Sequence, residues 1–421
     1  MLYLYPVISW TYLAIPLVAW GLALMSARRS RQTRLTRALL RSCTTGALVG
    51  GAVALLYSSV GGARVPLSQV AVACYLGISA LCVVFGLNWL LAQMVTRLFG
   101  IDPATGRGGR YFWTQVVAGV IQASLLMAIG LPYLGSILIL YRPKAPSAGD
   151  PQTLIEATFQ TVHFYAADGT PLEGWWIPAA HNRFTDGRGS AKWGDDSVVL
   201  CHGFAADKGK DLFLVRDLVA NGYNVLAVDL RAHGRSGGQF TGFGGIEARD
   251  VLGAIQWLRR THAGQCHRIL GLGEGLGAVA LIEAAASPDP AGQAIDAIAA
   301  YNPYDDLSAV ISEVADHHVV SAGQWAIKHA ILPVASAQLG SDLARVRPAA
   351  ALRSLWPRPL LILGDPLSRD PSGGRSFDLF QSAPQPKYAY WRKDADHDTL
   401  LHDPTAALTV RIFFDGERSF L

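Results

Sequence analysis

The chain has 421 residues, of which 51% are hydrophobic and only 16% are charged, and its formal net charge is +4. A soluble domain usually carries about 25% charged residues, so the composition does not fit an ordinary soluble protein over the whole length. The excess arginines lie between apolar stretches and form no basic stripe, so we expect no nucleic-acid partner. The length fits two or three domains, and the composition changes near residue 141 from apolar to ordinary globular.

The first part of the chain contains four apolar stretches, at residues 4–25, 43–60, 69–94 and 112–141. A helix needs about 20 apolar residues to cross a bilayer, and several of these stretches have tryptophans near their ends, as in the aromatic belt of membrane proteins. We therefore predict that residues 1–141 form a transmembrane domain of about four helices in contact with the lipid bilayer.

Positive charge between the stretches predicts the orientation. Arginines fill the loop at residues 28–41, and the third loop holds Arg97, Arg107 and Arg110. Such loops favour the cytoplasm, so four spans place the C-terminal domain outside it, on the periplasmic face of a bacterial-type inner membrane. If the short stretch 43–60 does not cross the membrane, the number of spans is odd and this orientation no longer follows. Residues 142–152 are rich in Pro, Gly and Ser and are predicted to be a linker.

The remaining residues, 153–421, alternate between strand and helix patterns. Residues 158–164 and 172–177 predict a hairpin around the turn Asp168-Gly169-Thr170. Further strands are expected at residues 197–201, 224–228, 268–272, 297–300, 359–363 and 388–391, and helices at 211–220, 245–260, 276–286 and 405–414. This alternation predicts an α/β domain with a mostly parallel, doubly wound sheet.

Five short motifs occur in a familiar order. They are Asp168–Trp176, Cys201–Phe204, Asp229–Ser236, Asn302–Leu307 and Ala395–Asp398. Over residues 158–414 the chain resembles the α/β-hydrolases, in particular the serine-aminopeptidase-like and dienelactone-hydrolase-like branch. The resemblance implies an α/β-hydrolase fold, with residues 308–358 as the lid region. A fold alone does not establish an activity.

The resemblance also implies where a nucleophile would stand. In this fold a serine occupies a tight strand-to-helix turn written Gly-x-Ser-x-Gly. Here the turn reads Gly271-Leu272-Gly273-Glu274-Gly275-Leu276-Gly277, which places Gly275 at the serine position. A shift of two residues would place Gly273 there instead. In either register the position has no side chain that can form an acyl-enzyme.

The other implied site residues are partly matched. His397 stands at the position of the catalytic base, and the position of the acid is taken by Leu367, with Asp365 and Asp370 as nearby candidate acids. The backbone N–H groups of Phe204 and Leu276, with Gly203 in the same loop, would form the oxyanion and ligand-binding hole.

These observations favour a membrane-anchored, catalytically degenerate hydrolase that binds a small apolar or carbonyl ligand or a membrane-protein partner. One alternative is an active ester or amide hydrolase that uses Glu274, or Ser236 with His397. Another is a structural subunit of a membrane complex. We expect no cofactor, because Gly273–Ala278 resembles a dinucleotide fingerprint without the later acidic residue, and no metal, because His397, Asp398, His402 and Asp403 match no zinc spacing.

Overall fold

A computed structural model describes residues 136, 139–141, 144, 149–180, 195–318, 321–366, 371–393, 400 and 402–416. The chain divides into two compact units, Met1–Ala128 and Ile129–Leu421, and every described residue belongs to the second. Apart from the end of the fourth, the predicted membrane spans lie outside the described residues. Among the residues that are described, no helix is both long and apolar enough to cross a membrane.

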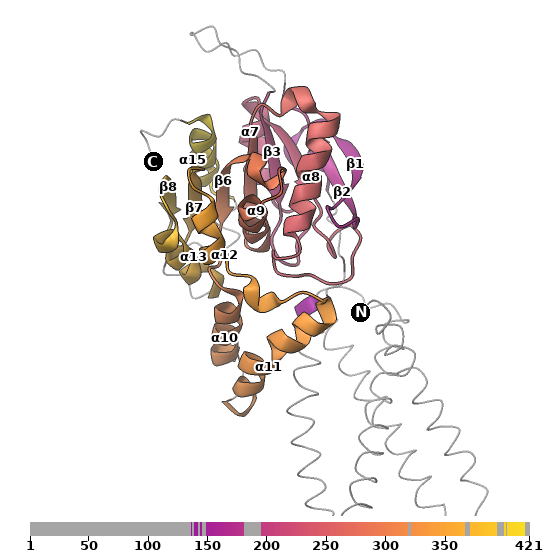
Figure 1. Ribbon diagram of the computed structural model, residues 1–421. Helices are drawn as coiled ribbons and strands as arrows, with labels where there is room; N and C mark the ends of the chain where they lie inside the picture. The colour runs from indigo at the N-terminus through magenta and orange to yellow at the C-terminus, as the bar shows by residue number, and fades with distance from the viewer. Residues whose placement is uncertain are drawn as a thin grey trace, which may run out of the picture. The chain divides into compact units, whose positions relative to one another are not determined.

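The second unit is built on one eight-stranded sheet with the order β1-β2-β4-β3-β5-β6-β7-β8 (Figure 1). The pairs β1–β2 and β2–β4 are antiparallel and the other pairs are parallel. The strands are β1 Gln160–Tyr165, β2 Pro171–Ile177, β3 Ser197–Cys201, β4 Asn224–Val228, β5 Ile269–Glu274, β6 Ile295–Tyr301, β7 Leu360–Gly364 and β8 Lys387–Trp391. The predicted α/β class and mostly parallel sheet are confirmed.

Local chemistry explains the first turn of the sheet. The Asp168 carboxylate accepts hydrogen bonds from the N–H of Thr170 at 3.2 Å and from its hydroxyl at 2.9 Å, while Gly169 has φ +84°. A short acidic side chain followed by glycine is the expected composition of such a turn. The turn joins β1 to β2 in the predicted hairpin.

Helices cover both faces of the sheet. On one face α7 (Leu212–Ala220) and α15 (Pro404–Asp415) pack on alternate residues of the central strands, among them Leu200 and Leu272. On the other face, α8 (Ala248–Thr261) and α9 (Leu276–Ala286) pack on the intervening residues, and Figure 1 shows these two helices in front of the sheet. Every residue of β3, β4, β5 and β7 is buried, as expected for parallel strands covered on both sides.

A third apolar cluster lies beyond the carboxyl end of β6. It includes residues of α10 (Leu307–His318) and α11 (Ser321–Leu339), which fall in the predicted lid region, together with Val279 of α9. The chain then continues through α12 (Pro348–Ala351) to β7, and α13 (Pro371–Ser382) follows β7. Four short 3-10 helices complete the connections, at Ala263–Gln265, Gly292–Ala294, Leu343–Arg345 and Leu352–Ser354.

The last residues of the fourth predicted span pack into this third cluster. Leu140 is fully buried there, and its carbonyl accepts a hydrogen bond from the N–H of Thr241 at 3.0 Å. The Gln338 side chain of α11 donates to the Ser136 hydroxyl at 2.9 Å. The described end of the apolar run therefore packs inside the second unit, where the loop residue Thr241 and Gln338 of α11 supply hydrogen-bond donors to it.

The last two residues of the predicted linker, 151 and 152, are helical, although Pro, Gly and Ser led us to expect no helix there. They begin a short helix, α6 (Pro151–Ile155), that is capped by Asp150. The Asp150 carboxylate accepts from the N–H of Thr153 at 2.9 Å, and the Thr153 hydroxyl accepts from the N–H of Asp150 at 2.9 Å. Proline lacks an N–H and has a fixed φ, so at a first helical position it starts a helix as readily as it ends one elsewhere.

Candidate active site

The turn between β5 and α9 has an unusual backbone conformation. Gly275 has φ +48° and ψ −108°, Glu274 before it ends the strand, and Leu276 after it begins the helix. The N–H of Gly275 donates to the carbonyl of Tyr301 on β6 at 2.8 Å, which fixes the turn to the neighbouring strand. This is the geometry of a sharp strand-to-helix elbow, which presents one residue at the end of the sheet.

The three alternate glycines of this turn are not equivalent. A Cβ on Gly273 would lie 2.6 Å from the N atom of Ala278, and a Cβ on Gly277 would lie 2.2 Å from the carbonyl oxygen of Cys201. Apart from its two chain neighbours, a Cβ on Gly275 would meet no described atom within 4 Å. Close packing of strand, helix and loop thus requires the outer two glycines, whereas only Gly275 has room for a side chain. This geometry favours Gly275 over Gly273 as the position for a nucleophile.

The loop after β3 packs directly on the first turn of α9. In this loop the buried His202 ring accepts a hydrogen bond from the N–H of Leu230 at 3.1 Å, so its other nitrogen donates to the carbonyl of Gly203 at 2.8 Å. Burial and the neighbouring His233 lower the pKa of His202 to about 4, which keeps the ring neutral. The ring therefore acts as a fixed link between this loop and the end of β4.

The two segments that carry the predicted oxyanion residues Phe204 and Leu276 lie against each other here. Phe204 follows Gly203, and its ring stacks on Phe243 with 5.3 Å between centroids. Leu276 is the first residue of α9, so its N–H has no acceptor within the helix. Because Gly277 lies against the carbonyls of Cys201 and His202, the backbones of the two predicted donor segments are in contact.

A pair of buried acids lies under the same loop. The carboxylate of Glu274 lies against Gly203, where a Cβ would come within 2.5 Å of its Oε1. Burial, together with the neighbouring Glu274, raises the pKa of Asp211 well above its ordinary value. Neither carboxyl oxygen of Asp211 accepts a hydrogen bond from a described group. The sequence analysis missed Asp211; an acid directly before the apolar helix 212–220 was the only available signal.

The predicted base and acids are only partly placed. His397 and Asp370 lie outside the described residues, so their roles stay predictions. Asp365 directly follows β7 and is buried at the same carboxyl edge of the sheet as Glu274. Ser236, the alternative nucleophile, donates its hydroxyl to the carbonyl of Asp229 at 2.5 Å and accepts from the N–H of Glu173 at 2.9 Å, so its hydroxyl joins β2 to the loop after β4.

A second set of buried charges, which the sequence analysis also missed, contains both acids and the lysine that neutralises them. The Lys208 ammonium donates to Glu173 at 3.0 Å and to Asp229 at 2.5 Å. The Asp229 carboxylate also accepts from the backbone N–H groups of Lys208 and Arg235, each at 2.8 Å. Burial alone would raise the pKa of Asp229, but Lys208 and these N–H groups hold it below its ordinary value. The cluster binds the oxyanion loop to β2 and β4.

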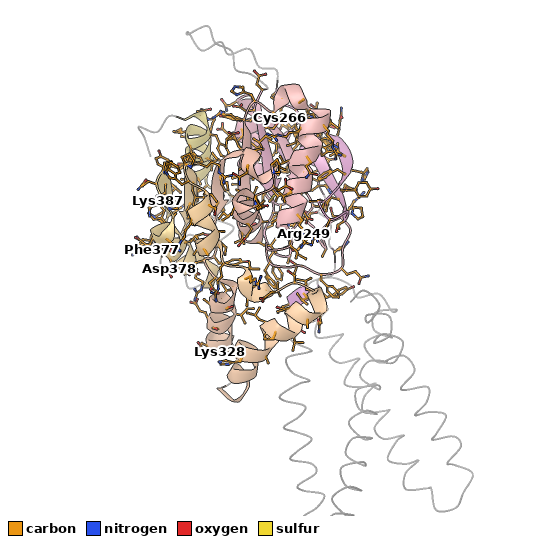
Figure 2. All side chains as sticks on the ribbon, in the orientation of Figure 1. Arg249, Cys266, Lys328, Phe377, Asp378 and Lys387 are labelled. Atoms are coloured by element: carbon orange, nitrogen blue, oxygen red, sulfur yellow. The ribbon has the colours of Figure 1, made fainter. Side chains whose placement is uncertain are left out.

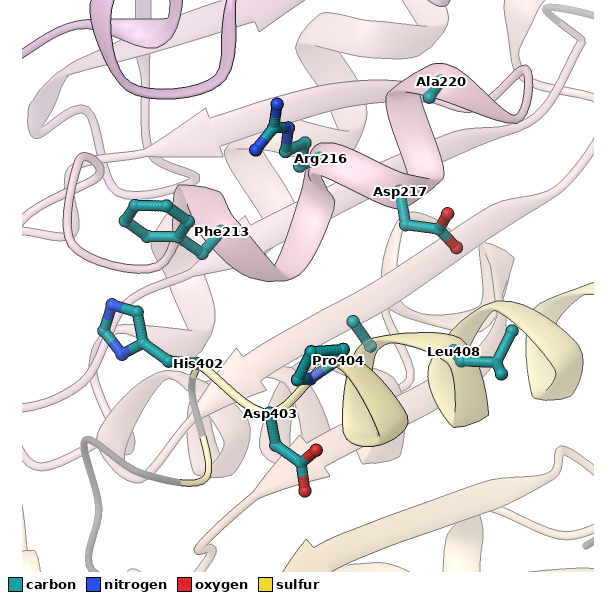
Figure 3. Close-up of a pocket in the computed structure, with 9 residues that line it drawn as sticks. Phe213, Arg216, Asp217, Ala220, His402, Asp403, Pro404 and Leu408 are labelled. Atoms are coloured by element: carbon teal, nitrogen blue, oxygen red, sulfur yellow. The ribbon is translucent and has the colours of Figure 1, made fainter.

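Two of the surface cavities in the described residues are lined by side chains other than those at the elbow. The larger, of about 430 Å³, lies between α7 and α15 (Figure 3), and the Phe213 and His402 rings stand 4.9 Å apart at its edge. The smaller, of about 370 Å³, is lined by Asp305, Asp306, Arg347, Ala349, Ala350, Arg353 and Ser382. Within the described residues no group of His, Cys, Asp and Glu side chains is arranged to hold a metal ion.

Comparison with known proteins agrees with this architecture. Residues 194–341 match the family model of the serine aminopeptidases, S33. An esterase of Pyrococcus furiosus is 19% identical, with a TM-score of 0.50 and coverage of 66% of this chain and 98% of its own. A hypothetical protein of Pseudomonas aeruginosa is 18% identical, with a TM-score of 0.47 and coverage of 65% and 99%. No curated protein matches the chain. At these identities the structural likeness shows the fold alone.

Proposed function

Because the chain is an α/β hydrolase of the serine-aminopeptidase-like type, we propose that its second unit retains the hydrolase site without serine-type catalysis and binds a ligand at the elbow. The observation that carries this proposal is Gly275. It has the backbone conformation of the elbow, with φ +48° and ψ −108°, and apart from its chain neighbours no described atom lies within 4 Å of the position that a Cβ would take. A glycine there cannot form an acyl-enzyme.

The remaining parts of the site suit a ligand oxygen. Backbone N–H groups are independent of side chains, so the donors expected at Phe204 and Leu276 survive the loss of a serine. The amino end of α9, a helix of 11 residues, adds its positive partial charge. The ligand class is therefore a small molecule with a carbonyl or anionic oxygen and an apolar body.

Membrane anchoring is a further part of the proposal, supported by the four apolar stretches of residues 1–141. The second unit would then act at the periplasmic face, on a ligand or a membrane-protein partner. Membrane fractions extracted with alkaline carbonate should retain the full chain. Protease added to spheroplasts should degrade the second unit while the membrane is intact. Release of the chain by carbonate would contradict membrane anchoring. Protection of the second unit from protease would contradict the periplasmic orientation.

The elbow is tested with the full chain in detergent, by labelling with a fluorescent fluorophosphonate. We expect no labelling of the natural chain and clear labelling of Gly275→Ser, because the added hydroxyl would enter open space beside the oxyanion donors. Gly275→Ala is the matched control, since it adds the same Cβ without a hydroxyl. Gly275→Ser with His397→Ala should lose the label if His397 is the base.

Labelling of the natural chain on a serine would contradict the proposal. The variant Ser236→Ala then identifies or excludes the one serine considered as an alternative nucleophile. If Gly275→Ser stays unlabelled although its thermal melting shows a folded chain, the elbow does not lie in an open hydrolase site.

A further inference from the structure

The cavity between α7 and α15 has the size of a small-molecule site. Its volume of about 430 Å³ falls within the range of about 300–1,000 Å³ that such sites occupy (Figure 3). Within each helix the lining positions recur every three to four residues, so each helix contributes one side of the cavity. The lining residues are Phe213, Arg216, Asp217, Ala220, His402, Asp403, Pro404, Ala407 and Leu408.

The cavity has an apolar side chain on each wall. Phe213 of α7 is 41% exposed and Leu408 of α15 is 42% exposed, whereas their neighbours Leu214 and Val410 are buried in the core of the sheet. The Phe213 and His402 rings lie 4.9 Å apart between centroids. Apolar groups that line a concave surface gain free energy when a ligand removes them from water. The walls therefore favour a ligand with an apolar body.

The acidic groups of the cavity already have cationic partners. The carboxylate of Asp217 accepts from Arg411 at 2.8 Å, and that of Asp403 pairs with Arg392 at 2.6 Å. Arg216 is exposed, and its guanidinium has no acceptor among the described residues. When these partners are counted, the described charges around the cavity leave one positive charge, on Arg216. The charge therefore favours a ligand with an anionic group.

We propose that this cavity binds a small amphipathic carboxylate, whose charged group pairs with Arg216 and whose apolar body covers Phe213 and Leu408. A planar guanidinium suits a carboxylate because it can donate two parallel hydrogen bonds. A neutral apolar molecule would leave the guanidinium without an acceptor, and an inorganic anion would leave the apolar walls in water. The site lies outside the turn between β5 and α9, so it does not depend on the proposed function.

The experiment uses the full chain in lipid nanodiscs, so that no detergent enters the cavity. The photoreactive carboxylate 4-(trifluoromethyl-diazirinyl)benzoate is added over a range of concentrations, and the labelled peptides are identified by mass spectrometry. We expect saturable labelling within residues 212–220 and 402–411. An excess of 4-phenylbutyrate should compete, and 4-phenylbutanol, which has the same apolar body without the charge, should compete less well.

Two substitutions test the two parts of the ligand. Arg216→Gln should raise the concentration for half-maximal labelling by about fivefold, which is the most that an exposed ion pair usually contributes. High salt should reduce this difference, because exposed charges are screened. Leu408→Asp should weaken labelling at least as much, because it removes an apolar wall and adds a charge that repels the carboxylate.

Arg353→Gln is the matched control, because Arg353 is also exposed and lines the smaller cavity. It should leave labelling of α7 and α15 unchanged. Thermal melting establishes that the variants are folded. If Arg216→Gln does not fold, Leu408→Asp and the comparison of the acid with the alcohol decide.

The labelled peptides separate this inference from the proposed function. Labelling that does not saturate, or that is confined to peptides of the elbow, overturns the second site and leaves the serine-free elbow intact. Saturable labelling of α7 and α15 that Arg216→Gln does not weaken also overturns it, because the charge then plays no part. Saturable labelling that the acid displaces and that Arg216→Gln weakens supports it, whatever fluorophosphonate shows for Gly275→Ser.

Discussion

Two clusters of buried acids near the loop after β3 differ in one respect. In the first, Glu173 and Asp229 surround the ammonium of Lys208, which is 3% exposed and bonds to both. In the second, burial and the neighbouring Glu274 raise the pKa of Asp211 well above its ordinary value, although Lys210 acts to lower it. Both lie near the oxyanion loop. A cluster that contains its own cation stabilises the fold, whereas a buried carboxyl group with a raised pKa lowers stability once the pH exceeds its ordinary value.

The largest expected effect comes from removing the cation of the first cluster. Lys208→Met should lower the free energy of unfolding by about 3–5 kcal/mol, because Glu173 and Asp229 would stay buried without a partner. Urea unfolding of the full chain, monitored by the near-UV circular dichroism of the second unit, measures the change. A loss below about 1 kcal/mol would mean that the first cluster contributes no more than a surface pair.

The second effect concerns pH, and it has opposite signs in the two clusters. The pKa of Asp229 is lowered in the folded chain, so its contribution to stability is present above the ordinary value of 3.8 and is lost as the pH falls. The pKa of Asp211 is raised, so the folded chain binds its proton more tightly than the unfolded chain. Stability is therefore lost as the pH rises above 3.8 through the raised pKa.

Asp211→Asn should remove that loss and raise the stability near pH 8 by roughly 1–3 kcal/mol, the penalty of a buried unsatisfied group. Asp229→Asn should instead destabilise the chain at neutral pH and flatten the acid side of the profile. Melting temperatures of both variants between pH 4 and 9 compare the two clusters directly. If the melting temperatures of the two variants change with pH in the same way, the two clusters do not differ in their effect on stability.

The smallest effect sets the scale for an exposed pair. Lys328 on α11, labelled in Figure 2, bonds to Asp316 at 2.5 Å, but the two side chains are 26% and 49% exposed. Lys328→Met should change the free energy of unfolding by less than about 1 kcal/mol, because water screens the pair. Measured beside Lys208→Met, it separates the effect of losing a lysine from the effect of burial. If Lys328→Met and Lys208→Met lower the free energy of unfolding by similar amounts, the loss comes from removing a lysine and not from its burial.

Much of the fold followed from local patterns. The strands 197–201 and 224–228 and the helix 276–286 have the bounds expected from their apolar runs and flanking residues. These segments are short and buried on every side or bounded by glycine, so periodicity and turn residues suffice. The start of α6 was missed because a proline near Gly and Ser has the composition of a linker, although its position after Asp150 makes it the first residue of a helix.

The site was harder to predict because its details depend on contacts between distant segments. The sequence already favoured Gly275 over Gly273 but left both registers open, and what spacing could not show is that a Cβ on Gly273 would strike the N atom of Ala278. Asp211 was missed because the influence of Glu274 on its pKa comes from β5, which is distant in the sequence. The roles of His397 and Asp370 and the predicted spans stay predictions.

The burial of Leu140 determines how this unit can be handled as a separate piece. A fragment that begins in the predicted linker would lose Ser136 and Leu140, and so would open an apolar hole against Val279 of α9 and the helix α11. Measurements on such a fragment would describe an α9 helix that has lost part of its packing, and the uncovered apolar face favours aggregation. A fragment that represents the native unit has to begin upstream of Ser136, near the boundary at Ile129.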